Sequence, residues 1–126
     1  MSIRCGVDII EIERVGRAWR KRPDYFLRRV FTEEEQQAIE GRPYPVKHLA
    51  ARFAAKEAVF KLLGAGIGEL SWTDVEIFSR PSGEPWVRLS GRAAERARTL
   101  SVGDIAVSLS HSRELAIAQA VAICKD

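Results

Sequence analysis

The run RFAAKEAVFKLLGAG, residues 52–66, places one glutamate and two lysines in a helical pattern that is otherwise apolar nearly all round. The pattern predicts a long helix over residues 46–63 that ends at Gly64. A helix of this kind is buried, so the rest of the chain must fold against it. One face carries large apolar side chains, at Leu49, Phe53, Phe60 and Leu63. The neighbouring face carries only small side chains apart from one acid and one base, and its residues are Ala50, Ala54, Glu57, Lys61 and Gly64.

The charges of Glu57 and Lys61 have two interpretations. Four residues apart on one helix, they can form a surface pair that stabilises the helix by about 0.2–0.5 kcal/mol. The second interpretation is a functional site, which a buried helix favours, because burying charged side chains is costly and is rarely retained without a functional reason. The small residues beside them also leave room for a ligand. We therefore favour a functional site at Glu57 and Lys61.

Asp8 raises the same question at another place in the chain. It stands in GVDIIEI, near the end of a strand predicted over residues 3–10. Asp8 can cap the following helix, with Glu11 as its capping-box partner. Alternatively it is a ligand for Mg²⁺, which takes one or two carboxylates and completes its shell with water and substrate phosphates. Asp8 and Glu57 could supply that pair, with Lys61 beside them as a phosphate-directed charge.

The remaining elements follow from periodicity and from turn residues. A helix is predicted over residues 11–21, with short helical turns continuing to Phe31. Thr32 then caps a further helix that ends near Gly41. The other expected elements are a loop at residues 43–45, strands at 74–78 and 85–89, a helix at 91–100, and antiparallel strands at 104–110 and 115–124 joined through HSRE. A chain of 126 residues suits one hydrophobic core, so we expect one domain over residues 1–126.

A basic stretch lies near the N-terminus. Seven of the sixteen residues from Arg14 to Arg29 are Lys or Arg, although the net charge of the whole chain is only +3. Arg14, Arg17 and Lys21 share one face of the predicted helix. Such a face attracts an acidic protein surface or a nucleic acid, or it is simply solvated. Charge alone leaves all three alternatives open.

His111, in SLSHS, is a lone histidine near a strand end, and such residues are more often structural than catalytic. Cys5 and Cys124 have neither metal-ligand nor disulfide spacing, so we expect two buried thiols. No apolar stretch approaches the roughly 20 residues that span a bilayer, and the first residues lack the features of a secretory signal. A cytoplasmic location is therefore expected.

Four segments together resemble a known family. GVDIIEIERV, RFAAKEAVFKLLGAGIG, SGEPWV and SLSHSRELAIAQAVA, in this order, are similar to the small stand-alone phosphopantetheinyl transferases, the holo-acyl-carrier-protein synthases. The resemblance extends from Ile3 to Ile123. Arg52 stands where the family's helix motif usually begins with an arginine. Ala65 departs from a common pattern with a small hydroxyl residue after the helix-ending glycine.

The resemblance implies a reaction and a set of roles. Such enzymes transfer 4′-phosphopantetheine from coenzyme A to a serine hydroxyl of apo-acyl carrier protein and release adenosine 3′,5′-bisphosphate. By similarity, Asp8 and Glu57 hold Mg²⁺, Glu57 or a water beside it accepts the serine proton, and Lys61 stabilises the phosphate charge. The implied coenzyme-binding residues are Arg52, Gly64, Pro85, His111 and Ser112. Arg14, Arg17 and Lys21 would dock the acidic helix beside the carrier's serine.

The implied fold is α+β, with a small, mainly antiparallel sheet packed on one long helix and several shorter helices. Family members usually form homotrimers with coenzyme A between adjacent subunits. We expect no nucleic-acid or membrane partner, and the carrier could serve fatty-acid or polyketide synthesis. The main alternative is a non-enzymatic basic module, in which Asp8 is an N-cap and Glu57 is structural. That alternative predicts neither coenzyme A binding nor a metal requirement.

Overall fold

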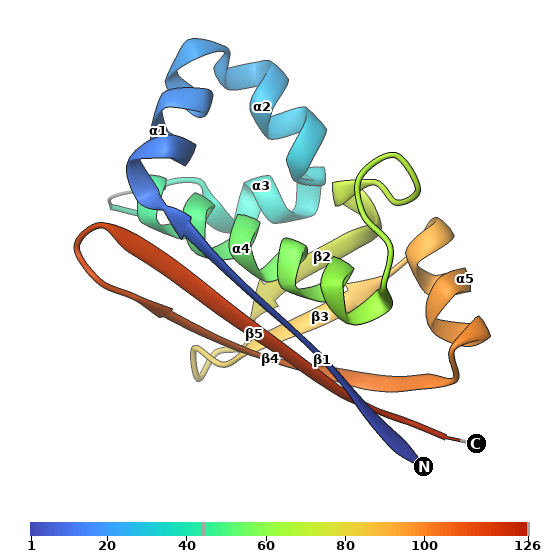
Figure 1. The fold of residues 1–126 in the computed structure, drawn as a ribbon. Coiled ribbons are helices and arrows are strands. Elements are labelled where there is room, and N and C mark those ends of the chain that lie inside the picture. The colour runs from blue at the N-terminus through green and yellow to red at the C-terminus, as the bar shows by residue number, and fades with distance from the viewer. Residues whose placement is uncertain (44, 126) are drawn as a thin grey trace.

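The computed structural model describes residues 1–43 and 45–125. Helix α4 lies at the centre, with a three-stranded antiparallel sheet against one side and a β-hairpin behind it (Figure 1). The element bounds are β1 (Ser2–Glu11), α1 (Ile12–Lys21), α2 (Pro23–Val30), α3 (Glu33–Ile39), α4 (Pro45–Leu63), the 3₁₀ helix η1 (Trp72–Asp74), β2 (Val75–Ser79), β3 (Pro85–Leu89), α5 (Gly91–Thr99), β4 (Val102–His111) and β5 (Leu115–Cys124). The α+β class predicted from the sequence is confirmed.

Strand β5 is the middle strand of the larger sheet, whose order is β1-β5-β4. Its residues alternate strictly between buried and exposed positions. The buried positions are occupied by small side chains, at Ala116, Ala118, Ala120, Ala122 and Cys124. Helix α4 presents equally small buried residues, at Ala50, Ala54, Ala55 and Ala58. Small side chains on both surfaces allow the sheet and the helix to approach closely.

Gly6 marks the closest approach of β1 to α4. A Cβ atom on Gly6 would overlap the carbonyl oxygen of Ala58 and lie 2.8 Å from the amide nitrogen of Leu62. Side chains two apart on a strand point to the same face, so Asp8 also points toward α4. The contact at Gly6 therefore places Asp8 beside the part of α4 that carries Glu57 and Lys61.

A buried ion pair joins α3, α4 and β2. Lys56 and Glu35 have side chains with no exposed surface, and Lys56 Nζ lies 2.7 Å from Glu35 Oε1. Lys56 Nζ also donates to the carbonyl oxygens of Trp72, at 3.0 Å, and Val75, at 2.5 Å. The other carboxylate oxygen of Glu35 accepts from the Ile77 amide at 3.0 Å. Every charge is paired and hydrogen-bonded, as a buried pair requires.

Several predictions from the sequence need correction. Cys5 is exposed and only Cys124 is buried, because alternate residues of β1 lie on the outer face of the sheet. Glu11 is the N-cap residue of α1 and no side chain caps that helix, so the capping role considered for Asp8 is wrong. On α5, Arg96 is half-buried and donates to the Leu63 carbonyl oxygen at 2.8 Å.

The other expected elements occur close to their predicted bounds. Thr32 caps α3, as the sequence predicts, and the structure adds a complete capping box with Glu35. The one element with no counterpart in the sequence prediction is the 3₁₀ helix η1, among the described residues. Residue 44, inside the predicted loop, and residue 126 lie outside the described residues. Within residues 1–43 and 45–125, no helix combines the length and the hydropathy needed to cross a membrane.

The packing at Gly6 predicts that Gly6→Ala destabilises the fold, because the new methyl group meets helix backbone that cannot rotate away. We expect a loss of roughly 1–3 kcal/mol in the free energy of unfolding, the usual cost of overpacking. Urea denaturation followed by circular dichroism measures it. Gly66→Ala is the matched control, because open space surrounds a Cβ there. Equal stability of both variants would contradict the proposed contact.

Candidate active site

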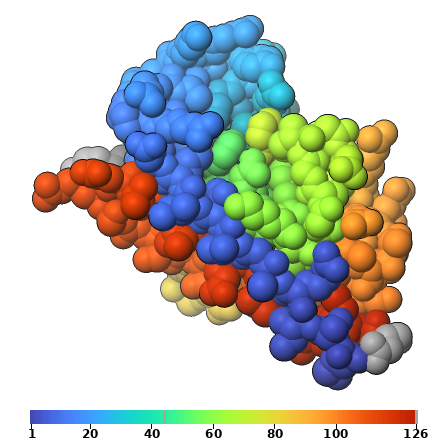
Figure 2. Space-filling model, in the orientation of Figure 1, coloured from blue at the N-terminus to red at the C-terminus, as the bar shows by residue number. Residues whose placement is uncertain are grey.

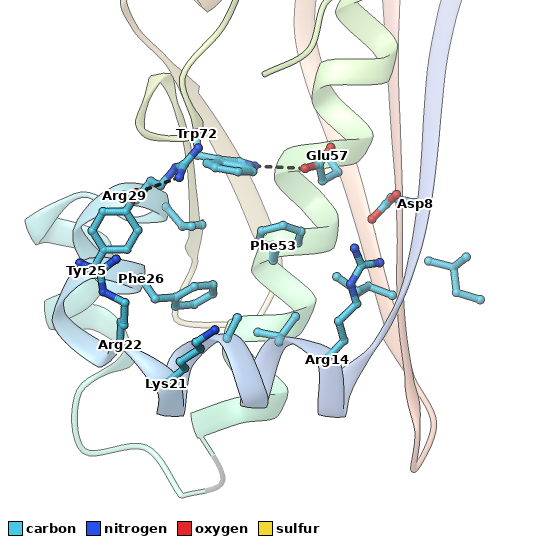
Figure 3. Close-up of a pocket in the computed structure, with 15 residues that line it drawn as sticks. Asp8, Arg14, Lys21, Arg22, Tyr25, Phe26, Arg29, Phe53, Glu57 and Trp72 are labelled. Atoms are coloured by element: carbon cyan, nitrogen blue, oxygen red, sulfur yellow. Dashed lines mark hydrogen bonds between the residues drawn. The ribbon is translucent and has the colours of Figure 1, made fainter. Parts of the chain in front are cut away.

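A cavity of about 720 Å³ opens between β1, α1, α2, α4 and η1. Figure 2 shows green atoms of α4 between the lobe formed by α1 and α2 and the yellow-green segment that follows α4. Asp8 and Glu57 lie at one end of the cavity, and aromatic side chains form its other walls (Figure 3). The aromatic residues are Tyr25, Phe26, Phe53 and Trp72, and the basic ones are Arg14, Lys21, Arg22 and Arg29.

Asp8 and Lys61 form an ion pair between β1 and α4. Lys61 Nζ lies 3.1 Å from Asp8 Oδ1 and donates to the Val7 carbonyl oxygen at 2.9 Å. The Asp8 side chain is 17% exposed and that of Lys61 is 56% exposed. The partner of Lys61 is thus Asp8 on the neighbouring strand, and not Glu57 on its own helix. The simple helix-stabilising pair considered from the sequence is wrong.

Glu57 is half-buried in the cavity wall. Its Oε1 atom accepts a hydrogen bond from Trp72 Nε1 at 3.2 Å (Figure 3). Burial raises the pKa of Glu57, the Trp72 hydrogen bond opposes this rise, and the charge of Asp8 adds to it while that of Lys61 lowers it. The ionised forms of Glu57 and Asp8 therefore repel each other. A cation placed between the two carboxylates would relieve this repulsion.

Asp8 and Glu57 are suited to Mg²⁺. The hydrogen bonds between described residues use Asp8 Oδ1 and Glu57 Oε1, and leave Asp8 Oδ2 and Glu57 Oε2 without a protein donor. No group of three or more His, Cys, Asp or Glu side chains among the described residues could hold a metal ion. Two carboxylates are nevertheless a donor set that Mg²⁺ accepts, when water and substrate phosphates complete its shell. The donor chemistry of the two residues thus fits this ion.

Three of the predicted coenzyme-binding residues form a second group, outside the cavity wall. Arg52 Nη2 donates to Ser79 Oγ at 2.9 Å, and Ser79 pairs with Pro85 in the β2–β3 hairpin. Burial, followed by the charges of Arg42, Arg52 and His111, lowers the pKa of His48. Arg52 and His111 therefore both lie close enough to His48 to affect its pKa. None of Arg52, Pro85 and His111 is among the residues that line the cavity with the two carboxylates.

The remaining predicted residues lie in three further positions. Gly64 ends α4 with a φ of +69°, and the Nη2 atoms of Arg4 and Arg96 lie 3.1 and 3.4 Å from where its Cβ would be. Ser112 forms the turn between β4 and β5, where its Oγ accepts from the Leu115 amide at 3.1 Å. Arg17 is exposed on α1, outside the cavity that Arg14 and Lys21 line.

Sequence reasoning missed several residues that the fold brings to this region. Trp72 and Arg29 line the cavity, but η1 shows no periodicity and the basic stretch gave no reason to single out Arg29. Arg4 donates to the Leu62 carbonyl oxygen at 2.7 Å, across 58 residues of sequence. Contacts over such separations have no local signal in the chain.

Comparisons with known proteins agree with this architecture. The family model of the 4′-phosphopantetheinyl transferase superfamily matches residues 4–120. The holo-(acyl-carrier-protein) synthase of Moorella thermoacetica is 49% identical over 119 residues, which is 94% of this chain and 92% of the relative. The crystal structure of the Neisseria meningitidis synthase has a TM-score of 0.86 at 30% identity and covers 95% of this chain and 97% of that one. The Helicobacter pylori synthase, in complex with coenzyme A, has a TM-score of 0.82 at 31% identity, covering 94% and 99%.

Proposed function

The chain belongs to the 4′-phosphopantetheinyl transferase superfamily, and from this membership we propose that it converts apo-acyl carrier protein into the holo form. It transfers 4′-phosphopantetheine from coenzyme A to a serine hydroxyl, depends on Mg²⁺ and releases adenosine 3′,5′-bisphosphate. The observation that carries the proposal is the convergence of Asp8, Glu57 and Lys61 across the β1–α4 contact. A non-enzymatic basic module is excluded, because the chain is a phosphopantetheinyl transferase.

The transfer makes one bond and breaks one. The serine oxygen of the carrier attacks the phosphorus that bears the pantetheine arm, and the bond from this phosphorus to the bridging oxygen of the diphosphate breaks. The bridging oxygen leaves with adenosine 3′,5′-bisphosphate. Glu57, or a water beside it, accepts the serine proton, a role that its raised pKa favours. The ammonium group of Lys61 neutralises charge that develops on the phosphates.

Asp8 and Glu57 would hold Mg²⁺ with the oxygens that no protein donor occupies. When bound, the ion supplies positive charge against the diphosphate and orients it. Two basic residues of the cavity, Arg14 and Lys21, lie on α1 and are exposed, so a partner in solution can reach them. We assign this side to the acidic carrier helix, and place Arg17 at its edge.

A homotrimer would unite the two groups of predicted site residues. The carboxylates of one chain and the group of Arg52, Pro85 and His111 of the next would then bind one coenzyme A, with Gly64 and Ser112 at its margins. The outer side of β1 and β5 supports such an assembly because these strands expose apolar side chains there. Its exposed apolar residues are Ile3, Val7, Ile9, Leu115, Ile117, Val121 and Ile123. We also propose that residues 1–126 form one domain and that the protein is located in the cytoplasm.

Intact-mass analysis of an apo-carrier tests the proposed activity. The carrier is incubated with this protein, coenzyme A and Mg²⁺, and with each component omitted in turn. A gain of one phosphopantetheine group only in the complete mixture is the expected result. No mass gain in the complete mixture would reject the proposal.

Asp8→Asn and Glu57→Gln should each abolish most of the transfer activity while the fold stays intact. Loss of a positioned proton acceptor lowers a rate by about 10²–10⁴-fold, and loss of a metal ligand adds to this. Transfer rates and thermal melts are measured together. Glu95→Gln is the control, because it makes the same change at an exposed residue of α5. Near-normal turnover in both site variants would refute the metal site.

The apolar outer face predicts a closed trimer in solution. Light scattering at micromolar concentration should give three times the chain mass of 14.1 kDa. Ile123→Asp should lower the measured mass, because it places a charge on the proposed interface. Ile67→Asp, at a similarly exposed residue outside the sheet, should leave the mass unchanged. A monomer mass for the unmodified protein would exclude the shared coenzyme site.

Arg14→Glu combined with Arg17→Glu should raise the Michaelis constant for the carrier at low ionic strength, and raise it less at high salt. Charges at the rim of an interface mainly speed the association of the two proteins, and dissolved salt screens this attraction. Coenzyme A binding should barely change. Carrier titrations at two salt concentrations measure the effect. Arg98→Glu combined with Lys125→Glu gives an equal charge change outside the cavity. Unchanged carrier kinetics in the α1 variant would mean that this face is only solvated.

A further inference from the structure

The indole ring of Trp72 forms part of the cavity wall and contacts three other side chains that line it. The indole Nε1 atom donates to Glu57 Oε1 at 3.2 Å. The ring packs at a tilt against Phe53, with 5.6 Å between the ring centroids, and the Arg29 guanidinium carbon lies 5.3 Å from the indole ring centroid. Figure 3 shows the indole extending from η1 toward Glu57, with its N–H end directed at the carboxylate. The ring thus contacts both Phe53 and Arg29, and the one polar atom of its side chain points at Glu57.

The main chain of Trp72 is fixed by Lys56, the residue of α4 that precedes Glu57. Its carbonyl oxygen accepts from Lys56 Nζ at 3.0 Å, and Lys56 is fully buried against Glu35. Lys56 cannot move away without leaving a buried charge unpaired, which is strongly unfavourable. Lys56 and Glu57 are adjacent in sequence, so α4 holds the backbone of Trp72 with one residue and meets its indole with the next. The position of the indole relative to Glu57 is therefore set by the protein interior.

We propose that Trp72 is a positioning residue for Glu57, an inference that rests on the proposed transferase function. The indole N–H holds Oε1, so that Glu57 acts on its ligands through Oε2. A free glutamate side chain samples several rotamers, and restricting it before the reaction removes part of the cost of alignment. The buried ion pair of Lys56 and Glu35 serves the reaction indirectly, because it anchors the backbone from which the indole extends.

A purely structural role for the ring predicts something different. As a wall of the cavity, the ring would affect how the carrier or the coenzyme binds, and any aromatic side chain of similar size would suffice. As a positioning donor, Trp72 affects the turnover of bound substrate, and only the N–H matters. Trp72→Phe separates the two, because it keeps an aromatic ring beside Phe53 and Arg29 and removes the donor.

Steady-state kinetics of Trp72→Phe test the proposal. We expect kcat to fall by about ten- to a hundredfold, the scale of one lost hydrogen bond to a charged group, with both Michaelis constants within about twofold of the parent values. Trp86→Phe is the matched control, since Trp86 packs on Phe78 in the β2–β3 hairpin outside the cavity. An unchanged kcat in folded Trp72→Phe, or an equal loss in the control, would overturn the inference.

A second measurement requires neither catalysis nor a folded Trp72 variant. The chain has three tryptophans, and the indole N–H signals of ¹⁵N-labelled protein report on their hydrogen bonds. In the substrate-free protein, Glu57→Gln should shift one indole signal strongly and Glu95→Gln should shift none. No indole shift on Glu57→Gln would overturn the inference. A failure of the proposed function would appear separately, as absence of transfer by the unmodified protein.

Discussion

The contact of β1 with α4 at Gly6 is the constraint on which the rest of this structure depends. A residue without a side chain lets the strand lie against the backbone of the helix at Ala58. The alanines of β5 extend the same close packing across the sheet. Two turns of the helix and one short stretch of strand then lie near enough for Lys61 to reach Asp8. The chemistry of the site follows from backbone proximity, which only small residues permit.

Three charged residues in the C-terminal half of α4 have distinct environments. Lys56 is fully buried and holds α3 and β2 against the helix. Glu57 is half-buried, with a pKa raised chiefly by burial. Lys61 is mostly exposed and crosses to β1. One helix therefore supplies an interior anchor, a proposed base and metal ligand, and a phosphate-directed cation within two turns.

Local patterns predicted much of the fold. The apolar run of α4, the capping box at Thr32 and the alternation in β5 are each encoded by neighbouring residues, and their elements occur where the sequence predicts them. The helical wheel also places Glu57 and Lys61 on one face, but it compares residues within one helix and so could not show that Lys61 pairs with Asp8. Cys5 is exposed because it shares the more apolar face of β1 with Ile3 and Val7, and this face is the outer one, whereas the side with Gly6 lies against α4.

Long-range features were accessible only through resemblance or not at all. Asp8 and Glu57 are linked by no spacing rule, so their pairing was predicted from the family motifs. Trp72 has no periodic signal, and its role emerges only when η1 is seen against α4. That Arg52 and His111 are not among the residues that line the cavity is likewise a property of the folded chain.

Whether the β1–α4 contact builds a cation site is tested most directly by crystals grown with coenzyme A and with Mn²⁺ in place of Mg²⁺. An anomalous difference map at the manganese edge locates the ion without reference to activity. We predict one strong peak, coordinated by carboxylate oxygens of Asp8 and Glu57 and by phosphate oxygens of the coenzyme. A bound coenzyme with no manganese peak at these two carboxylates would contradict the metal site and the mechanism built on it.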